Sequence, residues 1–156
     1  MDEYIPSPRP RVAEQVELYE KSGGRDGTIE GTRSRLNSFR VHSLPVVIVN
    51  NIGRKTGAIR KTPLMKVIDG NSYVLVASMG GAPKHPLWYY NLLENPKVEI
   101  RDHTKIHSMI AVEIRDAVER KRYGTLRQKP TRHIKIINLR LIDLFLSSWL
   151  ISLSKP

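Results

Sequence analysis

The chain has 156 residues, of which 40% are hydrophobic and 26% charged, the size and composition of one ordinary domain with a buried core. It contains no cysteine, which excludes a disulfide framework, a thiolate metal site and a cysteine nucleophile. The first 30 residues mix prolines with charged residues and show no secretory signal, so we expect a cytoplasmic protein.

The net charge of +11 is unevenly distributed. Residues 1–120 hold 18 Lys and Arg against 14 Asp and Glu, a net charge of +4, whereas residues 121–156 hold 8 against 1, a net charge of +7. A nucleic-acid-binding module needs a basic stripe with aromatic side chains, but the first 120 residues carry no such stripe and aromatic content is only 6%. We therefore expect no nucleic-acid partner.

The N-terminal region is predicted to hold one helix. The proline-rich start, Ile5–Pro10, is expected to be extended. Arg11–Lys21 carries apolar residues at helical spacing, and Gly23 stands where a C-terminal helix cap belongs. The glycine-containing, basic stretch from Gly23 to Ser43 indicates a loop.

Short strands follow. Val46–Val49 is a β-branched run typical of a buried strand, and Thr62–Ile68 is predicted to be the next one. Asp69-Gly70-Asn71 is a hairpin signal, after which Tyr73–Ala77 returns as a third strand.

One helix is inserted before the last hairpin. Pro86 suits a first helical turn, and Asn95-Pro96 prevents its continuation. Val98–Ile100 and Ile106–Ile114 form the predicted hairpin. Many short antiparallel strands with one inserted helix favour a small barrel in an α+β domain.

The first candidate binding segment is the loop Gly53–Lys61. Its two glycines let a ligand approach the backbone, and successive N–H groups in such turns can form an anion-binding nest. It also contains four cations and no acid, the composition that a phosphate or polyanionic tail requires: Arg54, Lys55, Arg60 and Lys61. A solvated basic hairpin tip is an equally open interpretation of the composition alone.

The second candidate segment, Ala77–Pro86, leaves a strand and enters a helix. It delivers Gly80, Gly81 and Lys84 to a helix N-terminus, where free N–H donors and the helix dipole favour anions. Taken alone, a plain strand-to-helix connection explains it as well.

Together the two segments carry a family resemblance. The sequence from Asn50 to Ile100 contains "GRKTG…R…PL", "ASxGGAPKHPxWYxNL" and "NPxVE" in order, and "YEKSGGRDGTIEG" precedes it at Tyr19–Gly31. From about residue 12 to about residue 120, the chain resembles the deazaflavin-dependent (F420-dependent) nitroreductase family. The resemblance implies an α+β split β-barrel, FMN-binding-like, and hydride transfer from reduced coenzyme F420 to a quinone or nitro acceptor.

The resemblance also implies the coenzyme-binding residues. Arg54, Lys55 and Arg60 would hold the phosphate and oligoglutamate tail. The ring and ribityl chain would be lined by residues from the strands, the glycine loop and the inserted helix: Thr56, Thr62, Pro63, Leu64, Met65, Ala77, Ser78, Met79, Gly80, Gly81, Trp88, Tyr89 and Asn91. The family usually has lysine where this chain has Met79, so one cation is lost. No general acid is assigned, because the coenzyme carries the chemistry.

The tail departs from the family. Residues 121–156 lack the tyrosine-rich "YPxYxxYQ" segment and the closing "IPVF" strand, so we expect a split-barrel domain over residues 1–120 without its closing strand. Reading residues 121–150 two bases later, with chosen synonymous codons, gives "AVWDVAAKAYPPYKDYQFKTDRLIPVFLA". We hypothesise a frameshift near residue 120, which an early stop codon in that second frame would disprove. We also expect weakened coenzyme binding and low or absent turnover. The unpaired barrel edge is expected to favour association of the chain, such as a homodimer.

Other interpretations of the tail and site remain open. Ile134–Leu153 also fits an amphipathic helix, whose ten-residue apolar end is too short to span a bilayer but allows peripheral membrane association. The split barrel could instead bind FMN, another flavin or a haem-derived ligand. His103 and His107 lack a third ligand, so no metal site is predicted.

Overall fold

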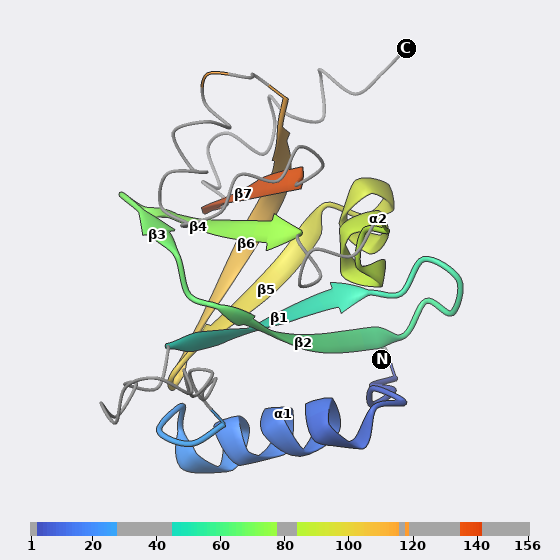
Figure 1. Ribbon diagram of the computed structural model, residues 1–156, viewed down its shortest axis with the longest axis vertical. Helices are drawn as coiled ribbons and strands as arrows, with labels where there is room; N and C mark the ends of the chain where they lie inside the picture. Colours follow the sequence, from blue (N-terminus) through green and yellow to red (C-terminus); the bar gives the residue numbers. More distant parts are fainter. Residues whose placement is uncertain (1–2, 28–44, 78–83, 116–117, 119–134, 142–156) are drawn as a thin grey trace, which may run out of the picture.

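The computed structural model describes residues 3–27, 45–77, 84–115, 118 and 135–141 (Figure 1). The elements in chain order are α1 (Pro10–Ser22), β1 (Val46–Ile52), β2 (Ile59–Met65), β3 (Ile68–Asp69), β4 (Ser72–Ala77), α2 (Leu87–Glu94), β5 (Lys97–Asp102), β6 (Lys105–Ile114) and β7 (Lys135–Leu141). The predicted α+β composition is confirmed. The second strand begins three residues earlier than predicted and ends at Met65, because Ile59–Met65 pairs along its whole length with β1. The predicted loop over residues 28–43 lies outside the described residues.

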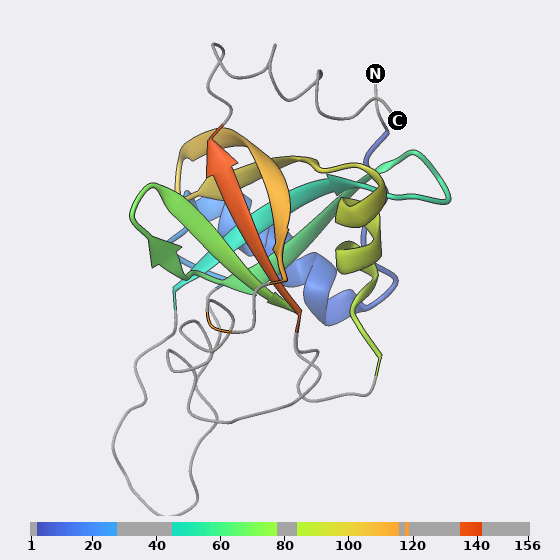
Figure 2. The same ribbon diagram turned by 90° about the horizontal axis from the view of Figure 1, so that it is seen from above.

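The strands form one curled antiparallel sheet in the order β2-β1-β5-β6-β7-β4-β3. The sheet wraps around a core drawn from both of its halves, so that β4 faces β1 and β2 across the interior (Figures 1 and 2). β2 and β4 are not neighbours in the hydrogen-bonded order. The gap between β2 and the β3–β4 hairpin, at the two ends of this order, is the open side of the split barrel.

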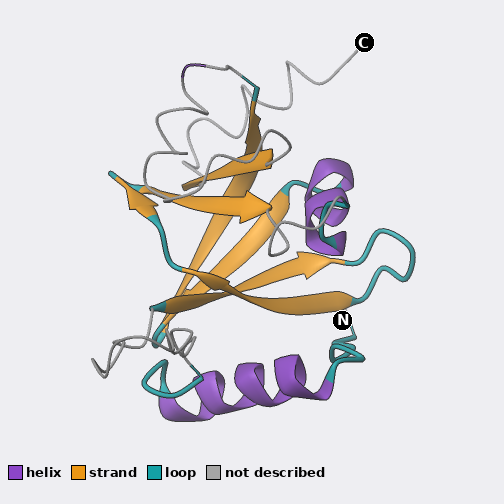
Figure 3. Cartoon of the chain, in the orientation of Figure 1, coloured by secondary structure: helices purple, strands orange, loops and turns teal. Residues whose placement is uncertain are grey.

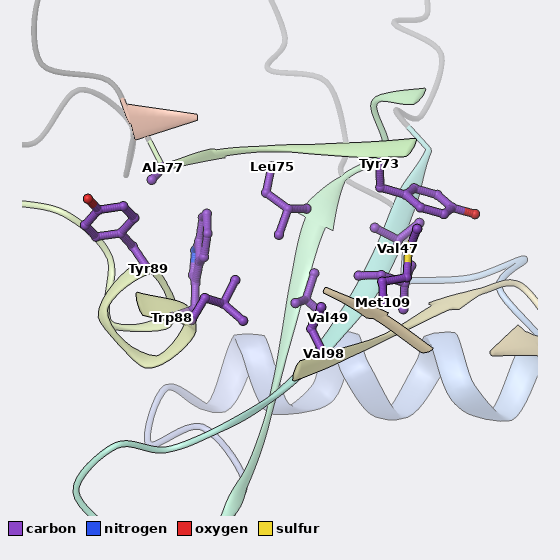
Figure 4. Packing of buried hydrophobic residues seen from close by; sticks show 11 residues of the cluster. Val47, Val49, Tyr73, Leu75, Ala77, Trp88, Tyr89, Val98 and Met109 are labelled. Atoms are coloured by element: carbon purple, nitrogen blue, oxygen red, sulfur yellow. The ribbon is translucent and has the colours of Figure 1, made fainter. Parts of the chain in front are cut away.

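The main core contains alternate residues of the strands together with the inner face of α2. Figure 4 shows Trp88 and Tyr89 of α2 turned toward the Ala77 end of β4, with Leu75 and Val49 farther in. Burial of one large aromatic side chain contributes about 1.5–3 kcal/mol, so α2 is held to the sheet mainly by Trp88, Tyr89 and Leu92. Packing therefore fixes where the N-terminal end of α2 lies.

Helix α1 covers the outer face of β1 and β2 (Figure 3). It ends at Gly23 in the left-handed conformation, with φ +64°, as the glycine predicted. A Cβ atom on Gly24 would lie 2.7 Å from the His103 Cα, so only glycine lets the helix end approach the β5–β6 hairpin. The Tyr19 hydroxyl accepts a hydrogen bond from the His103 N–H at 2.8 Å, completing this contact.

The sequence-based prediction that the barrel lacks its closing strand is wrong. Residues 135–141 form β7, which pairs with β6 on one side and β4 on the other. The same residues cannot belong to the alternative amphipathic helix over 134–153, whose remaining part lies outside the described residues. The sequence KIINLRL is rich in β-branched and aliphatic residues, which suit a central strand even though they do not match the family's closing motif.

The central position of β7 makes it necessary for the β3–β4 hairpin. Ile137 pairs with Leu75 of β4 and with Glu113 of β6. We predict that Ile137→Pro lowers the free energy of unfolding by roughly 1–3 kcal/mol or prevents folding, because proline removes a ladder N–H in a central strand.

Chemical denaturation of the purified variant tests this, with Ile137→Val as the matched control that keeps the N–H and the branched side chain. Equal stability of the proline variant and the parent protein would show that β7 does not form.

Candidate functional site

The β1–β2 hairpin is a tightly hydrogen-bonded loop. The Gly53 N–H donates to the Ala58 carbonyl at 2.8 Å, and the Gly53 carbonyl accepts from Thr56 at 3.2 Å and Gly57 at 2.8 Å. A Cβ on Gly53 would lie 2.8 Å from the Thr56 Oγ1, and Gly57 has φ +68°. The turn's backbone thus favours glycine at Gly57, and a side chain at Gly53 would displace the Thr56 hydroxyl.

Most of the hairpin's backbone donors are used within the protein. The Arg54 N–H donates to Asn91 Oδ1 at 3.1 Å and the Ala58 N–H to Thr56 Oγ1 at 3.3 Å. Among the described residues, only the Lys55 N–H of this loop has no acceptor. The predicted backbone nest is therefore reduced to one N–H group, and recognition of an anion here depends on side chains.

A pair of buried asparagines joins the hairpin to α2. Asn91 Nδ2 donates to Asn51 Oδ1 at 2.7 Å, while Asn91 Oδ1 accepts from Arg54 as described. Asn51 is 1% exposed and Asn91 8% exposed, so the amides are shielded from water. The Arg54 guanidinium lies 5.1 Å from the centroid of the Tyr90 ring, a second contact between the hairpin and the helix. The β1–β2 hairpin and α2 therefore lie together (Figures 1 and 2).

Three of the four predicted cations separate into two kinds. Arg54 and Lys55 are exposed at the hairpin tip, and no carboxylate of the described residues pairs with either. Lys61 points away: its Nζ lies 2.7 Å from Glu20 Oε1 on α1 and 4.6 Å from the Tyr4 ring centroid. The prediction of four cations with no acid is wrong for Lys61, because adjacent strand residues face opposite sides of the sheet.

The same alternation divides the predicted ring-lining run on β2. Thr62 and Leu64 stand opposite Val49 and Val47, which belong to the main core. Pro63 and Met65 stand opposite Ile48 and Val46, which pack under α1. Cross-strand neighbours share a face, so the side chains of Thr62 and Leu64 face the barrel and those of Pro63 and Met65 do not.

The second segment is partly described. Ala77 is buried at the end of β4, while Ser78, Met79, Gly80 and Gly81 lie outside the described residues. Trp88 and Tyr89 are buried beside Ala77 (Figure 4). The Tyr89 hydroxyl donates to Glu113 Oε1 at 3.0 Å. Burial, with help from this hydrogen bond, raises the pKa of Tyr89 to about 12, so its proton stays on the phenol at neutral pH.

Comparison with known proteins identifies the family to which the chain belongs. The sequence matches the F420H(2)-dependent quinone reductase family over residues 12–134. The chain belongs to this family.

Curated relatives of this F420H(2)-dependent quinone reductase family match part of the chain. The F420H(2)-dependent quinone reductase Rv1261c of Mycobacterium tuberculosis is 40% identical over 75 residues, which cover 48% of this chain and 50% of that protein. The putative F420H(2)-dependent quinone reductase Rv3178 of the same organism is 31% identical over 71 residues, covering 44% and 60%. The chain thus spans about half the length of the curated relatives it matches.

Solved structures agree with the split-barrel prediction. A structure described as F420-H2 dependent reductase (FDR-A) has a TM-score of 0.53 and 34% identity, covering 64% of this chain and 99% of that one. A putative pyridoxamine 5′-phosphate oxidase from Listeria innocua shares the fold alone, with a TM-score of 0.50 and 10% identity over 63% of this chain and 84% of that one. The predicted family and fold class are confirmed. None of the described helices is long and apolar enough to cross a membrane.

At the opposite end of β1 from the hairpin, a polar cluster closes the barrel. Asp102 Oδ2 lies 2.7 Å from Lys66 Nζ and accepts from the Tyr73 hydroxyl at 2.7 Å, and Asp102 Oδ1 lies 2.9 Å from His103 Nδ1. Lys66 follows β2 and Tyr73 lies on β4, so one carboxylate joins both sides of the split. Sequence reasoning missed this cluster, because residues so far apart in the chain share no spacing signal.

The histidines examined as metal ligands have other neighbours. His103 contacts Asp102, and the His107 ring centroid lies 6.0 Å from that of Tyr73. The described residues contain no group of three or more His, Cys, Asp or Glu that could hold a metal ion.

The Asp102 cluster predicts a pH dependence of stability. Burial alone would raise the Asp102 pKa, but hydrogen bonds from Lys66, Tyr73 and His103 outweigh it and hold the pKa below the ordinary value. A carboxyl whose pKa is lower in the folded state stabilises the fold above its unfolded pKa of about 3.9 and loses that contribution as the pH falls through the folded pKa. We expect Asp102→Asn to lower the free energy of unfolding by roughly 1–3 kcal/mol at pH 7, with a smaller difference below pH 4.

Urea denaturation at several pH values measures this difference. Glu94→Gln, an exposed carboxyl change on α2, is the control. A difference between Asp102→Asn and parent protein that stays constant from pH 7 to pH 3 would contradict the assignment.

Proposed function

We propose that this protein binds coenzyme F420 between the β1–β2 hairpin and α2, and that it is an F420H2-dependent reductase. The observation that carries the proposal is the exposed pair Arg54 and Lys55, with which no described carboxylate pairs. The backbone of this pair is fixed to α2, because the Arg54 N–H donates to Asn91 Oδ1. A polyanionic tail needs such uncommitted cations at a defined position. Family membership and the names of the relatives support the same activity.

The residues fit a phosphate-bearing redox coenzyme. Arg54, Lys55, the Lys55 N–H and Arg60 would hold the phosphate and oligoglutamate tail. Thr56, Thr62, Leu64, Ala77 and Trp88 would line the ring and ribityl chain, together with the predicted loop Ser78–Gly81. Bound reduced F420 supplies the hydride. The protein's part is to bind, orient and exclude water, and we assign no general acid.

Four residues of the set predicted from the sequence have different roles in this proposal. Asn91 positions Arg54, because its carbonyl oxygen and one amide hydrogen are engaged by the hairpin and Asn51. Tyr89 shapes the pocket wall through its ring, since its hydroxyl is engaged by Glu113. Pro63 and Met65 contribute through their backbone, because their side chains face α1.

The acceptor is proposed to be a quinone, with a nitro compound as the other class. The family name and the name of the mycobacterial relative support the quinone. The tyrosine-rich segment expected to shape the acceptor pocket is absent from residues 121–156, so we propose that this chain binds the coenzyme more weakly than its relatives and that its turnover is impaired.

Location, partners and the tail also stay proposals. A solved chain described as a domain-swapped dimer is 31% identical, with a TM-score of 0.54, and covers 86% of this chain and 100% of itself, which supports a homodimer. We propose a cytoplasmic enzyme that contacts the membrane peripherally, which fits a quinone acceptor. We propose no nucleic-acid partner. We retain the frameshift hypothesis for residues 121–156 as a proposal about the gene, which the gene sequence tests, but not the domain boundary near residue 120, because β7 is a central strand of the same sheet.

Coenzyme titration tests the proposal. Purified protein should quench or shift F420 fluorescence on binding. The Arg54→Ala/Lys55→Ala variant should bind about 100-fold more weakly, because each charge-assisted contact is worth about 1.5 kcal/mol or more. Binding should also weaken with salt.

The control is Arg11→Ala/Lys105→Ala, which removes the same charge from exposed positions on α1 and β6. Equal affinity of the parent and hairpin variants would refute the site. Tight binding of FMN in place of F420, seen in the absorbance of a co-purified ligand, would favour the flavin alternative.

A further inference from the structure

We infer that Glu3–Pro6 is a strap that orients Arg60 for the phosphate of the coenzyme. The inference rests on the proposed function and goes beyond it, because it assigns a role to an N-terminal segment that contributes no side chain to the proposed site. It concerns positioning of a binding residue, not chemistry.

The strap is anchored to the edge of β2 by backbone hydrogen bonds. The Ile59 N–H donates to the Glu3 carbonyl at 2.8 Å, and the Ile5 N–H donates to the Ile59 carbonyl at 3.1 Å. These bonds make a parallel bridge between Tyr4 and Ile59. The Tyr4 ring packs against Lys61 Nζ at 4.6 Å. The strap therefore lies beside the hairpin strand that carries Arg60.

Two carbonyl oxygens of the strap bind the same nitrogen of Arg60. Its Nη1 donates to the Ile5 oxygen at 3.2 Å and to the Pro6 oxygen at 3.3 Å. Pro6 has no N–H, and an extended proline-containing segment leaves its carbonyls without internal partners. These acceptors are neutral, so they fix the guanidinium plane and leave its positive charge available.

The rest of the Arg60 fork stays available. Within the described part of the chain, Arg60 Nη2 and Nε have no acceptor. The Arg60 stem crosses the base of the hairpin, where a Cβ on Gly53 would lie 3.5 Å from Arg60 Cγ. The backbone of Arg60 is held as well, because its carbonyl accepts from Asn51 Nδ2 at 3.4 Å. The side chain is thus fixed at both ends, on the strand that follows the hairpin of Arg54 and Lys55.

Prior orientation matters because a free arginine loses much rotamer entropy when it binds an anion. The strap removes this loss before the coenzyme arrives, which strengthens phosphate binding without a new charge.

The test uses the full chain. Ile5→Pro removes the N–H that anchors the strap to Ile59, and Ile5→Ala is the matched control that keeps it. We expect Ile5→Pro to bind F420 about tenfold more weakly, as Arg60→Ala also should, with no further loss in the double variant. Arg60→Lys, which keeps the charge but has no fork, should not restore affinity. All variants should bind a deazaflavin that ends at the ribityl chain, without phosphate, as the parent does.

Pro6→Gly is an independent second variant, because it loosens the strap while its carbonyl remains, and should show a smaller loss in the same direction. Parent-like F420 affinity in folded Ile5→Pro protein would overturn the inference, as would additive losses with Arg60→Ala or an equal loss for the phosphate-free deazaflavin. Failure of the intact chain to bind F420 would overturn the proposed function itself, whereas the outcomes just named leave Arg54 and Lys55 as its binding residues.

Discussion

The site depends on a buried hydrogen bond between two asparagine side chains. Asn51 sits at the end of β1, just before the hairpin, and Asn91 lies on α2, forty residues later, yet their amides meet at 2.7 Å with almost no exposure to water. Such a pair is favourable only when each polar atom finds a partner. Arg54 and Arg60 supply the remaining backbone partners. The hairpin can therefore hold its cations in one place although its tip is exposed.

Two groups of cations can be distinguished, those paired with carboxylates and those at the hairpin with which no described carboxylate pairs. Lys61 and Arg101 approach Glu20 beneath α1, and Lys66 pairs with Asp102 at the far end of the barrel. Arg54 and Lys55 pair with no carboxylate in the described ranges. Cations with structural partners contribute to stability, whereas the uncommitted ones at the hairpin give the molecule an anion-binding end. The overall charge of +11 would not have distinguished the two groups.

Local signals in the sequence predicted most of the elements. The helix cap at Gly23, the hairpin at Gly70 and the proline limits of α2 act within a few residues, so each is visible in the chain. The order and spacing of the glycine and cation motifs also indicated the family and brought two segments into one predicted site. The opposite directions of Arg60 and Lys61, the Asn51–Asn91 link and the Asp102 cluster depend on strand register and contacts between distant segments. β7 was missed because its residues lack the family's closing motif, whereas a central strand position requires mainly backbone pairing and aliphatic side chains.

The affinity of an Asn51→Ala variant for F420 tests the central claim most directly, because Asn51 acts in this account only by holding Asn91 and the Arg60 backbone. We predict a folded protein that binds F420 about tenfold more weakly, since loss of a buried hydrogen-bond partner costs about 1–3 kcal/mol, while Asn71→Ala in the exposed β3–β4 turn binds normally. Unchanged F420 affinity in folded Asn51→Ala protein would contradict the claim that the hairpin and α2 work as one site.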